Sequence, residues 1–156
     1  MKPIFIVSLP RAGSTLLQRI LMGHSRISSC GEPWLALPLV YMLKESGTIA
    51  EYGHFSSQKS IKAFVKGLPG AEKDYFKSMG NFLLELYQKR CNEGEMYFVD
   101  KTPRYYRILP ELRSAFPSAP VVILFRNPLS VFASMLNIVG GKIFYMQTWK
   151  SDWAVG

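Results

Sequence analysis

The sequence predicts an α/β fold in three layers, with a central and mostly parallel sheet flanked by helices. Nearly continuous apolar segments at residues 3–8, 96–99 and 121–125 alternate with segments of helical periodicity. Strands that are apolar on both faces are typical of a parallel sheet covered by helices. No repeat or interdomain linker interrupts the 156 residues, so we expect a single domain over residues 1–156.

The first strand is expected at residues 3–8, and a turn-rich segment follows it. Helical periodicity begins at Ser14, and Gly23 marks a suitable end. The expected apolar face of this helix consists of Leu16, Leu17, Ile20 and Leu21. Gln18 lies off that face, so this pattern predicts an amphipathic helix.

Residues 27–35 resemble a short strand that runs into a loop, because Pro33 disfavours a helical conformation at Glu32. We expect a helix at 35–45, a surface loop at 46–60, and helices at 59–68 and 71–91. The last of these repeats apolar residues at helical spacing, which predicts a core stripe. The stripe consists of Phe76, Met79, Leu83, Leu86 and Tyr87.

The two later strands both end in charged loops. Residues 96–99 are followed by Asp-Lys-Thr-Pro-Arg at 100–104, and residues 121–125 are followed by Arg-Asn-Pro at 126–128. Pro128 suits the first position of a helix and Asn127 suits its cap, so we expect a helix at 128–137.

The chain has 19 Lys and Arg against 11 Asp and Glu, a net charge of +8. This excess suits a nucleic acid, an anionic membrane surface or a phosphate-bearing small molecule. No apolar run reaches the roughly 18 residues of a membrane span, and no basic helix face or aromatic-basic strand points to nucleic acid. Cys30 and Cys91 form no CxxC unit, so we expect reduced thiols, no metal site and a cytoplasmic location.

The charged loops are expected to meet, because the carboxyl ends of parallel strands line one crevice. Arg11, Lys101, Arg104 and Arg126 then converge although they are far apart in the sequence. Four cations at one sheet edge predict an anion site.

The loop before the first helix is the most informative part of this site. Gly13 allows a tight turn, and the helix that follows presents Ser14, Thr15 and its positive end to an anion such as phosphate or sulfate. The loop is not a Walker A motif, because Ser8 stands at the place of its first glycine and Ser14 at the place of its lysine.

A second anion contact is expected from the last loop. Arg126 ends a strand and Ser134 lies about two turns into the next helix, so both can reach one phosphate. Ser130, one turn earlier on the same face, is a weaker candidate.

These motifs together resemble the sulfotransferase superfamily, with the closest similarity to carbohydrate-type, tyrosylprotein-type and bacterial members. Residues 5–17 are similar to its 5′-phosphosulfate loop, and the segment from Arg126 to Ser134 is similar to its 3′-phosphate motif. The segments at 100–105 and 31–34 resemble the Lys-[Thr/Asp]-Pro and Glu-Pro segments of the same family. All four occur in the family's order.

The resemblance implies a P-loop-like fold and transfer of a sulfuryl group from 3′-phosphoadenosine 5′-phosphosulfate (PAPS) to an acceptor hydroxyl or amine. Transfer is by in-line displacement without a metal, and adenosine 3′,5′-bisphosphate (PAP) is the product. The implied catalytic residues are Arg11, Glu32 and Lys101. The implied donor-binding residues are Pro10, Arg11, Ala12, Gly13, Ser14, Thr15, Arg126 and Ser134.

A general base must take the acceptor's proton, and we favour Glu32 in its Gly-Glu-Pro loop. Asp100 is the substitute candidate. His24 and His54 are less attractive, since one falls at a helix end and the other in a polar loop.

Two alternatives stay open, a P-loop kinase of small molecules or nucleotides and a nucleotide-binding fragment without catalysis. Family members carry further helices and a basic glycine-containing loop beyond the 3′-phosphate serine, so we expect this chain to be the N-terminal part of a longer family domain. The acceptor is expected to be a small molecule, a carbohydrate or a peptide.

Overall fold

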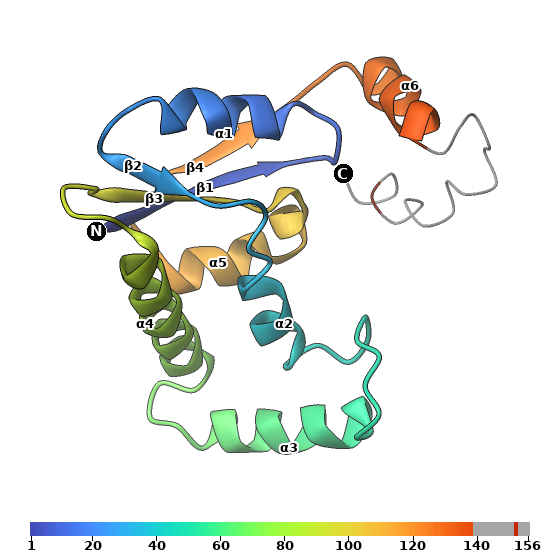
Figure 1. The fold of residues 1–156 in the computed structure, drawn as a ribbon. Coiled ribbons are helices and arrows are strands. Elements are labelled where there is room, and N and C mark those ends of the chain that lie inside the picture. The colour runs from blue at the N-terminus through green and yellow to red at the C-terminus, as the bar shows by residue number, and fades with distance from the viewer. Residues whose placement is uncertain (139–151, 153–156) are drawn as a thin grey trace.

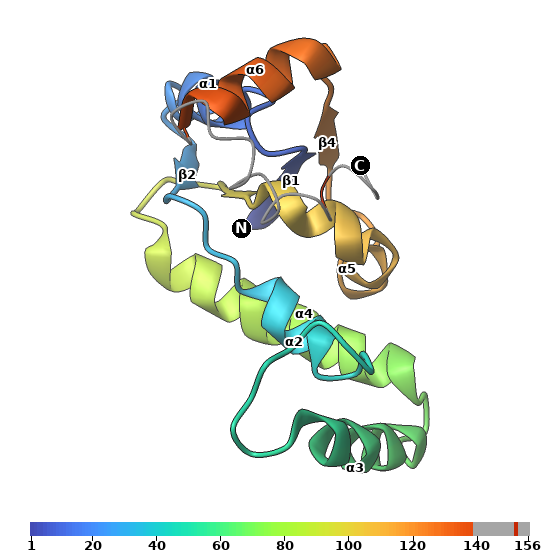
Figure 2. The same cartoon turned by 90° about the vertical axis from the view of Figure 1, so that its right-hand side faces the viewer.

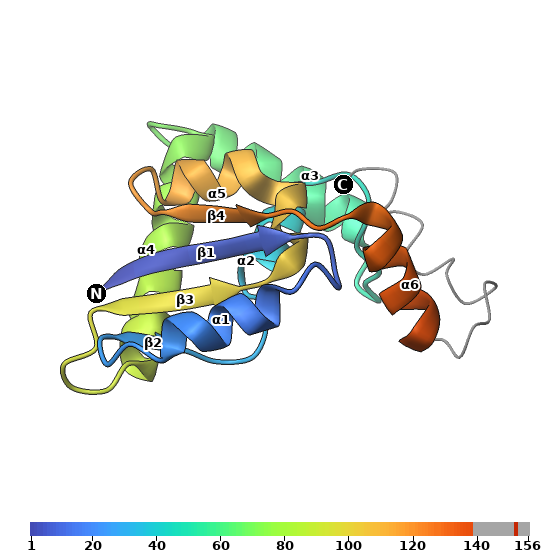
Figure 3. The ribbon, with the colours of Figure 1, turned by 90° about the horizontal axis from the view of Figure 1, so that it is seen from above.

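The computed structural model describes residues 1–138 and Asp152. Within them one sheet contains four parallel strands in the order β2-β3-β1-β4 (Figure 3). The strands are β1 (Lys2–Ser8), β2 (Ile27–Ser29), β3 (Tyr97–Lys101) and β4 (Val121–Leu124). The predicted α/β class with a parallel sheet is therefore confirmed.

Helices cover both faces of this sheet (Figures 1 and 2). They are α1 (Ser14–Met22), α2 (Ala36–Tyr41), α3 (His54–Lys66), α4 (Glu72–Arg90), the 3₁₀ helix η1 (Pro103–Ile108), α5 (Leu109–Ala115) and α6 (Pro128–Ile138). α1 packs on one face, against β1, β2 and β3, whereas α4 and η1 contact β1 from the other face. α5 packs on α4, and α3 lies farthest from the sheet, against α4.

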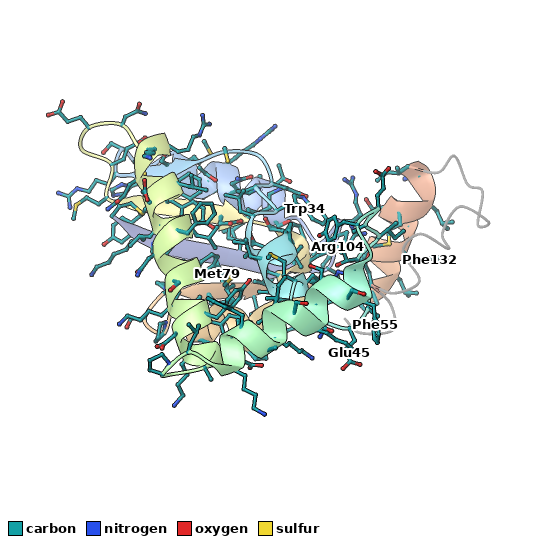
Figure 4. The ribbon with its side chains drawn as sticks, turned by 90° about the horizontal axis from the view of Figure 1, so that it is seen from below. Trp34, Glu45, Phe55, Met79, Arg104 and Phe132 are labelled. Atoms are coloured by element: carbon teal, nitrogen blue, oxygen red, sulfur yellow. The ribbon has the colours of Figure 1, made fainter. Side chains whose placement is uncertain are left out.

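The main core lies between the sheet and α4, α5 and η1. Phe5 of β1 and Phe98 of β3 are buried there, and the Phe98 ring stacks on Tyr87 with centroids 4.5 Å apart. Four of the five residues of the expected stripe of α4 are buried in this layer, namely Phe76, Met79, Leu83 and Tyr87, and Figure 4 labels Met79 on this helix. Leu86, the fifth, is only partly buried and lies outside the core cluster. Burial of these side chains is the main stabilising contribution to the fold.

The expected orientation of α1 is wrong. Leu16 and Ile20 are 66% and 64% exposed, whereas Gln18 is only 5% exposed. Gln18 is buried because its side-chain amide donates hydrogen bonds to Ser29 Oγ at 2.6 Å and to the carbonyl of Cys30 at 2.6 Å. A polar side chain with satisfied partners can replace an apolar one at a helix-sheet interface.

Several boundaries also differ from those expected. α2 ends at Tyr41, and α3 already begins at His54, which therefore lies on a helix and not in a loop. η1 and α5 were not predicted. β4 occupies one edge of the described sheet and exposes Ile123 by 48%, although its apolar run resembles that of a buried strand.

The start of α6 is as expected. The Asn127 side chain accepts a hydrogen bond from the Leu129 N–H at 2.9 Å, so it caps the helix, and Pro128 is the first helical residue. Figure 1 shows α6 beyond the carboxyl end of the sheet, on the side where α1 begins. This brings α6 close to the loop between β1 and α1.

Candidate active site

A cavity of about 450 Å³ lies at the carboxyl ends of β1 and β3. These strands are neighbours, but α1 follows β1 on one face and η1 follows β3 on the other. The two connections diverge there, which is where open α/β sheets bind ligands. The predicted site residues that line the cavity are Pro10, Arg11, Gly13, Ser14, Thr15, Glu32, Arg126 and Ser134.

The first loop presents the amino end of α1 to this cavity. Gly13 has φ 99°, and α1 has no side-chain cap, so its first N–H groups are available to a ligand. A β-carbon on Gly13 would meet no atom within 4 Å, so space does not require a glycine here. The positive φ favours glycine at this position. Ala12 lies behind the loop, only 7% exposed.

Two segments far apart in the sequence are joined beside this loop. The guanidinium of Arg11 donates a hydrogen bond through Nε to Ser134 Oγ at 3.1 Å, and Arg126 donates to the Arg11 carbonyl at 3.0 Å. Arg11 itself has φ 70°, a left-handed conformation that is unfavourable for a side-chain-bearing residue. The structure therefore brings the predicted 5′ and 3′ anion contacts to one place, whereas Ser130 does not line the cavity.

Glu32 and Lys101 form an ion pair at the other end of the cavity. Lys101 Nζ lies 2.7 Å from Glu32 Oε1 and donates to Thr15 Oγ1 at 3.3 Å. The Lys101 side chain is 4% exposed and that of Glu32 is 37% exposed. The carboxylate thus lines the cavity, whereas the buried ammonium contacts the carboxylate without lining the cavity.

The loop around Glu32 is held by two residues, Trp34 and Gln18, whose role there the sequence did not predict. Trp34, with φ 59°, donates its indole N–H to Glu32 Oε2 at 3.2 Å. Gln18 binds the carbonyls of Cys30 and Gly31 just before Glu32. A glutamine inside an otherwise apolar helical segment was the available signal, but its partners become adjacent only in the folded chain.

Arg104 differs from expectation. It lines the cavity beside Trp34, with its guanidinium 5.5 Å from the indole ring (Figure 4), but its charge is already paired with Asp152. Arg104 NH2 lies 2.8 Å from Asp152 Oδ2, and Tyr106 also donates to this carboxylate. The hydrogen bond with Asp152 raises the pKa of Arg104. Burial would raise the pKa of Asp152, but hydrogen bonds from Arg104 and Tyr106 outweigh it and lower that pKa.

The other proposed bases do not reach the cavity. Asp100 is fully buried and accepts hydrogen bonds from three hydroxyl groups, and burial raises the pKa of its carboxyl despite these bonds. His24 Nδ1 accepts from the Arg26 N–H, and the His54 ring bonds to the Lys44 carbonyl. Glu32 is the candidate base that lines the cavity.

Residues 1–138 and Asp152 hold neither a cluster of metal ligands nor a helix that could span a membrane. These residues contain no group of three or more His, Cys, Asp or Glu side chains placed to hold a metal ion. None of the described helices is both long enough and apolar enough to cross a bilayer.

Comparison with known proteins gives consistent matches. The sequence model of the sulfotransferase family matches residues 3–154. Nodulation protein NoeE of Sinorhizobium fredii is 32% identical over 137 residues, which is 87% of this chain and 31% of that protein. Human protein-tyrosine sulfotransferase 1 is 30% identical over 134 residues, 86% of this chain and 34% of that protein.

The chain spans about a third of the length of these relatives. The family match, in contrast, extends over almost all of this chain, including every residue of the cavity described above. The chain therefore belongs to the sulfotransferase family.

Proposed function

We propose that the chain binds PAPS and takes part in transfer of its sulfuryl group to an acceptor hydroxyl or amine. One observation carries this proposal. Arg11, Arg126 and Ser134 are joined by hydrogen bonds, and they line the same cavity as Glu32, which is paired with Lys101. A donor with phosphates at both its 5′ and 3′ positions needs two anion sites, and a transfer reaction needs a base beside them.

We assign each residue a role from its position in the site. Arg11 and the amide groups of residues 12–15 meet the negative charge that develops on the leaving phosphate. Arg126 and Ser134 bind the 3′-phosphate through a forked cation and a hydroxyl. Lys101 approaches the sulfuryl oxygens. These side chains and amides supply the positive charge, so the proposal includes no metal.

Glu32 completes the reaction by accepting a proton. As the acceptor oxygen or nitrogen forms its bond to sulfur, the bond between sulfur and the bridging phosphate oxygen breaks, and PAP leaves. The acceptor's proton goes to Glu32, whose Oε1 and Oε2 are oriented by Lys101 and Trp34. Lys101 also keeps this carboxylate beside the cavity while the acceptor binds.

A second cavity supports an acceptor position next to the donor. It has about 560 Å³ and shares Trp34 and Arg104 with the first cavity, while Tyr41 and Ile49 add apolar surface. Aromatic and apolar walls with a cation at the rim suit the ring of a sugar or of a tyrosine. We accordingly propose a carbohydrate or peptidyl acceptor here. The free thiols of Cys30 and Cys91 support a cytoplasmic location as part of this proposal.

Thermal unfolding with nucleotides tests donor binding. PAP at 100 times its dissociation constant should stabilise the chain by about 2.7 kcal/mol. At about 2–4 °C per kcal/mol, this raises Tm by roughly 5–10 °C. ATP with magnesium should give a much smaller shift, and the absence of a shift with saturating PAP would refute the proposal.

Transfer is tested separately with labelled PAPS and a panel of sugars and tyrosine peptides. Formation of PAP that depends on the acceptor supports transfer. Binding of PAP without any turnover would identify a nucleotide-binding chain without catalysis, and turnover of ATP with magnesium would favour a kinase instead.

A further inference from the structure

A buried carboxylate lies behind the loop that carries Glu32. Asp100 is 0% exposed and sits at the end of β3, next to Lys101. It accepts hydrogen bonds from Tyr87 OH at 2.6 Å, Thr102 Oγ1 at 2.8 Å and Tyr105 OH at 2.9 Å. Three hydroxyls on three different elements or loops therefore converge on one side chain that does not line the cavity.

The carboxylate fixes the direction of each of these hydrogen bonds. An ionised carboxylate only accepts, and a hydroxyl has a single proton to donate. The hydroxyls of Thr102 and Tyr105 thus donate their hydrogen bonds to Asp100, and their oxygen lone pairs can accept hydrogen bonds from other groups. Thr102 Oγ1 accepts from the Trp34 backbone N–H at 3.2 Å, and Tyr105 OH accepts from the Ala36 N–H at 3.1 Å.

These two backbone groups belong to the loop that carries Glu32. Trp34 needs support, because its left-handed φ of 59° is unfavourable for a residue that carries a side chain. Its indole also holds Glu32 Oε2, at 3.2 Å. Holding the Trp34 backbone therefore restricts the position of the Glu32 carboxylate.

We propose that Asp100 is a positioning residue, which orients the Thr102 and Tyr105 hydroxyls so that they hold the loop bearing Glu32 in its active position. The effect on turnover rests on the proposed role of Glu32 as base, whereas the effect on the loop does not. Tyr87 provides a natural comparison, since it donates to the same carboxylate from α4. Within the described residues, its hydroxyl makes no hydrogen bond to the loop.

Asp100→Asn tests the orienting charge. Asparagine has an NH2 donor in place of one acceptor oxygen, so at least one hydroxyl can no longer donate its proton to this side chain. That hydroxyl must turn its proton elsewhere, which disturbs the geometry of its contact with the loop. We expect kcat to fall by roughly 10- to 100-fold, because misplacement of a catalytic group by about 1 Å can cost 10²-fold. KM for PAPS and the affinity for PAP should stay within about threefold, since the donor residues are on other loops.

Thr102→Val tests the link to the loop with a smaller change, in case Asp100→Asn fails to fold. Valine is similar in size but cannot accept from the Trp34 N–H, so kcat should again fall by at least about tenfold. Thr102→Ser restores the hydroxyl and should recover kcat to within about threefold of wild type. Tyr87→Phe is the matched control, which should lower Tm but change kcat by less than about twofold. An equal loss of kcat in Tyr87→Phe and Thr102→Val would overturn the proposal.

The double variant with Glu32→Gln separates this proposal from the proposed function. If Thr102 acts through Glu32, Thr102→Val should slow the Glu32→Gln enzyme by less than about twofold. A full additional loss contradicts positioning. If Glu32→Gln turned over as fast as wild type, the proposed role of Glu32 as base would be rejected. The effect of Asp100 on the loop would then be tested by fluorescence.

Trp34 supplies that readout without any need for activity. With Trp149→Phe and Trp153→Phe, Trp34 is the sole tryptophan, and quenching by acrylamide reports its accessibility. Quenching should increase in Asp100→Asn and Thr102→Val, but not in Thr102→Ser or Tyr87→Phe. Unchanged quenching in the first two variants would show that the network does not hold the loop.

Discussion

The Lys101–Glu32 ion pair is buried on one side only, and this asymmetry predicts unequal effects of removing its two members. Lys101 is 4% exposed and Glu32 is 37% exposed, at an N–O distance of 2.7 Å. Glu32→Ala leaves a buried ammonium without its ion-pair partner, whereas Lys101→Met leaves a carboxylate that water can reach. Both changes remove the same contact, so a difference between them measures desolvation.

The expected magnitudes follow from burial. Loss of one partner of a fully buried pair costs about 3–5 kcal/mol, and loss from an exposed pair costs about 0.2–1 kcal/mol. Because Thr15 remains a partner for Lys101, we expect about 2–3 kcal/mol for Glu32→Ala and about 1 kcal/mol or less for Lys101→Met. At about 2–4 °C per kcal/mol, Tm should differ between the two variants by several degrees.

Urea denaturation at neutral pH measures these free energies, provided that the m-value is unchanged. The control is the Glu85–Lys89 pair on α4, which has the same N–O distance of 2.7 Å but side chains 63% and 69% exposed. Glu85→Ala and Lys89→Met should each change the free energy of unfolding much less than Glu32→Ala does, and any effect of losing this exposed pair should disappear in high salt. Equal effects of Glu32→Ala and Lys101→Met, or a larger effect of Lys101→Met, would refute the reasoning.

Three further predictions concern the anion site and the titrating groups. Arg11→Ala should lower kcat by about 10²–10³-fold, because it removes the charge that meets the leaving phosphate. Arg126→Ala should weaken PAP binding by roughly 10- to 100-fold. If steady-state and binding assays showed that each variant loses kcat and PAP affinity equally, the separate roles of Arg11 and Arg126 would be contradicted. Burial and the nearby Asp152 carboxylate raise the pKa of Tyr106 to about 12. An unfolded tyrosine has a pKa of about 10, so above that pH the folded state holds more protons than the unfolded state. The free energy of unfolding should therefore fall as the pH rises from about 10. If tyrosinate absorbance showed an ordinary pKa for Tyr106 in the folded protein, this prediction would be wrong. The lowered pKa of Asp152 has the opposite consequence: its stabilisation should be present above about pH 4 and lost as pH falls, so the urea midpoints of wild type and Asp152→Asn should converge in acid.

Local patterns predicted the parts of the site that depend on neighbouring residues in the sequence. The turn at Gly13 and the cap at Asn127 were predictable because one residue's backbone preference or side chain determines each of them. The approach of Arg126 to Arg11 was expected because parallel strands present their carboxyl ends together.

Features that depend on partners distant in the sequence could not be predicted in this way. The burial of Gln18 requires the carbonyls at the end of β2, and the pairing of Arg104 requires Asp152. The exposure of Ile123 follows from the place of β4 at the edge of the described sheet, which its apolar sequence does not reveal. The sequence suggested Asp100 as a possible base, but in the structure its buried carboxylate accepts hydrogen bonds from three hydroxyl groups and does not reach the cavity.

The alternation of side chains along β3 limits how this segment can change in length. Asp100 and Lys101 are adjacent and point to opposite faces, one toward the hydroxyls of Tyr87 and Tyr105 and the other toward Glu32. An insertion or deletion of one residue in β3 before Asp100 would exchange these directions, and place an ammonium among the hydroxyl donors and a carboxylate beside Glu32. A substitution in β3 changes one side chain and keeps the directions of the others, whereas single-residue insertions or deletions should abolish the active site even if the sheet still forms.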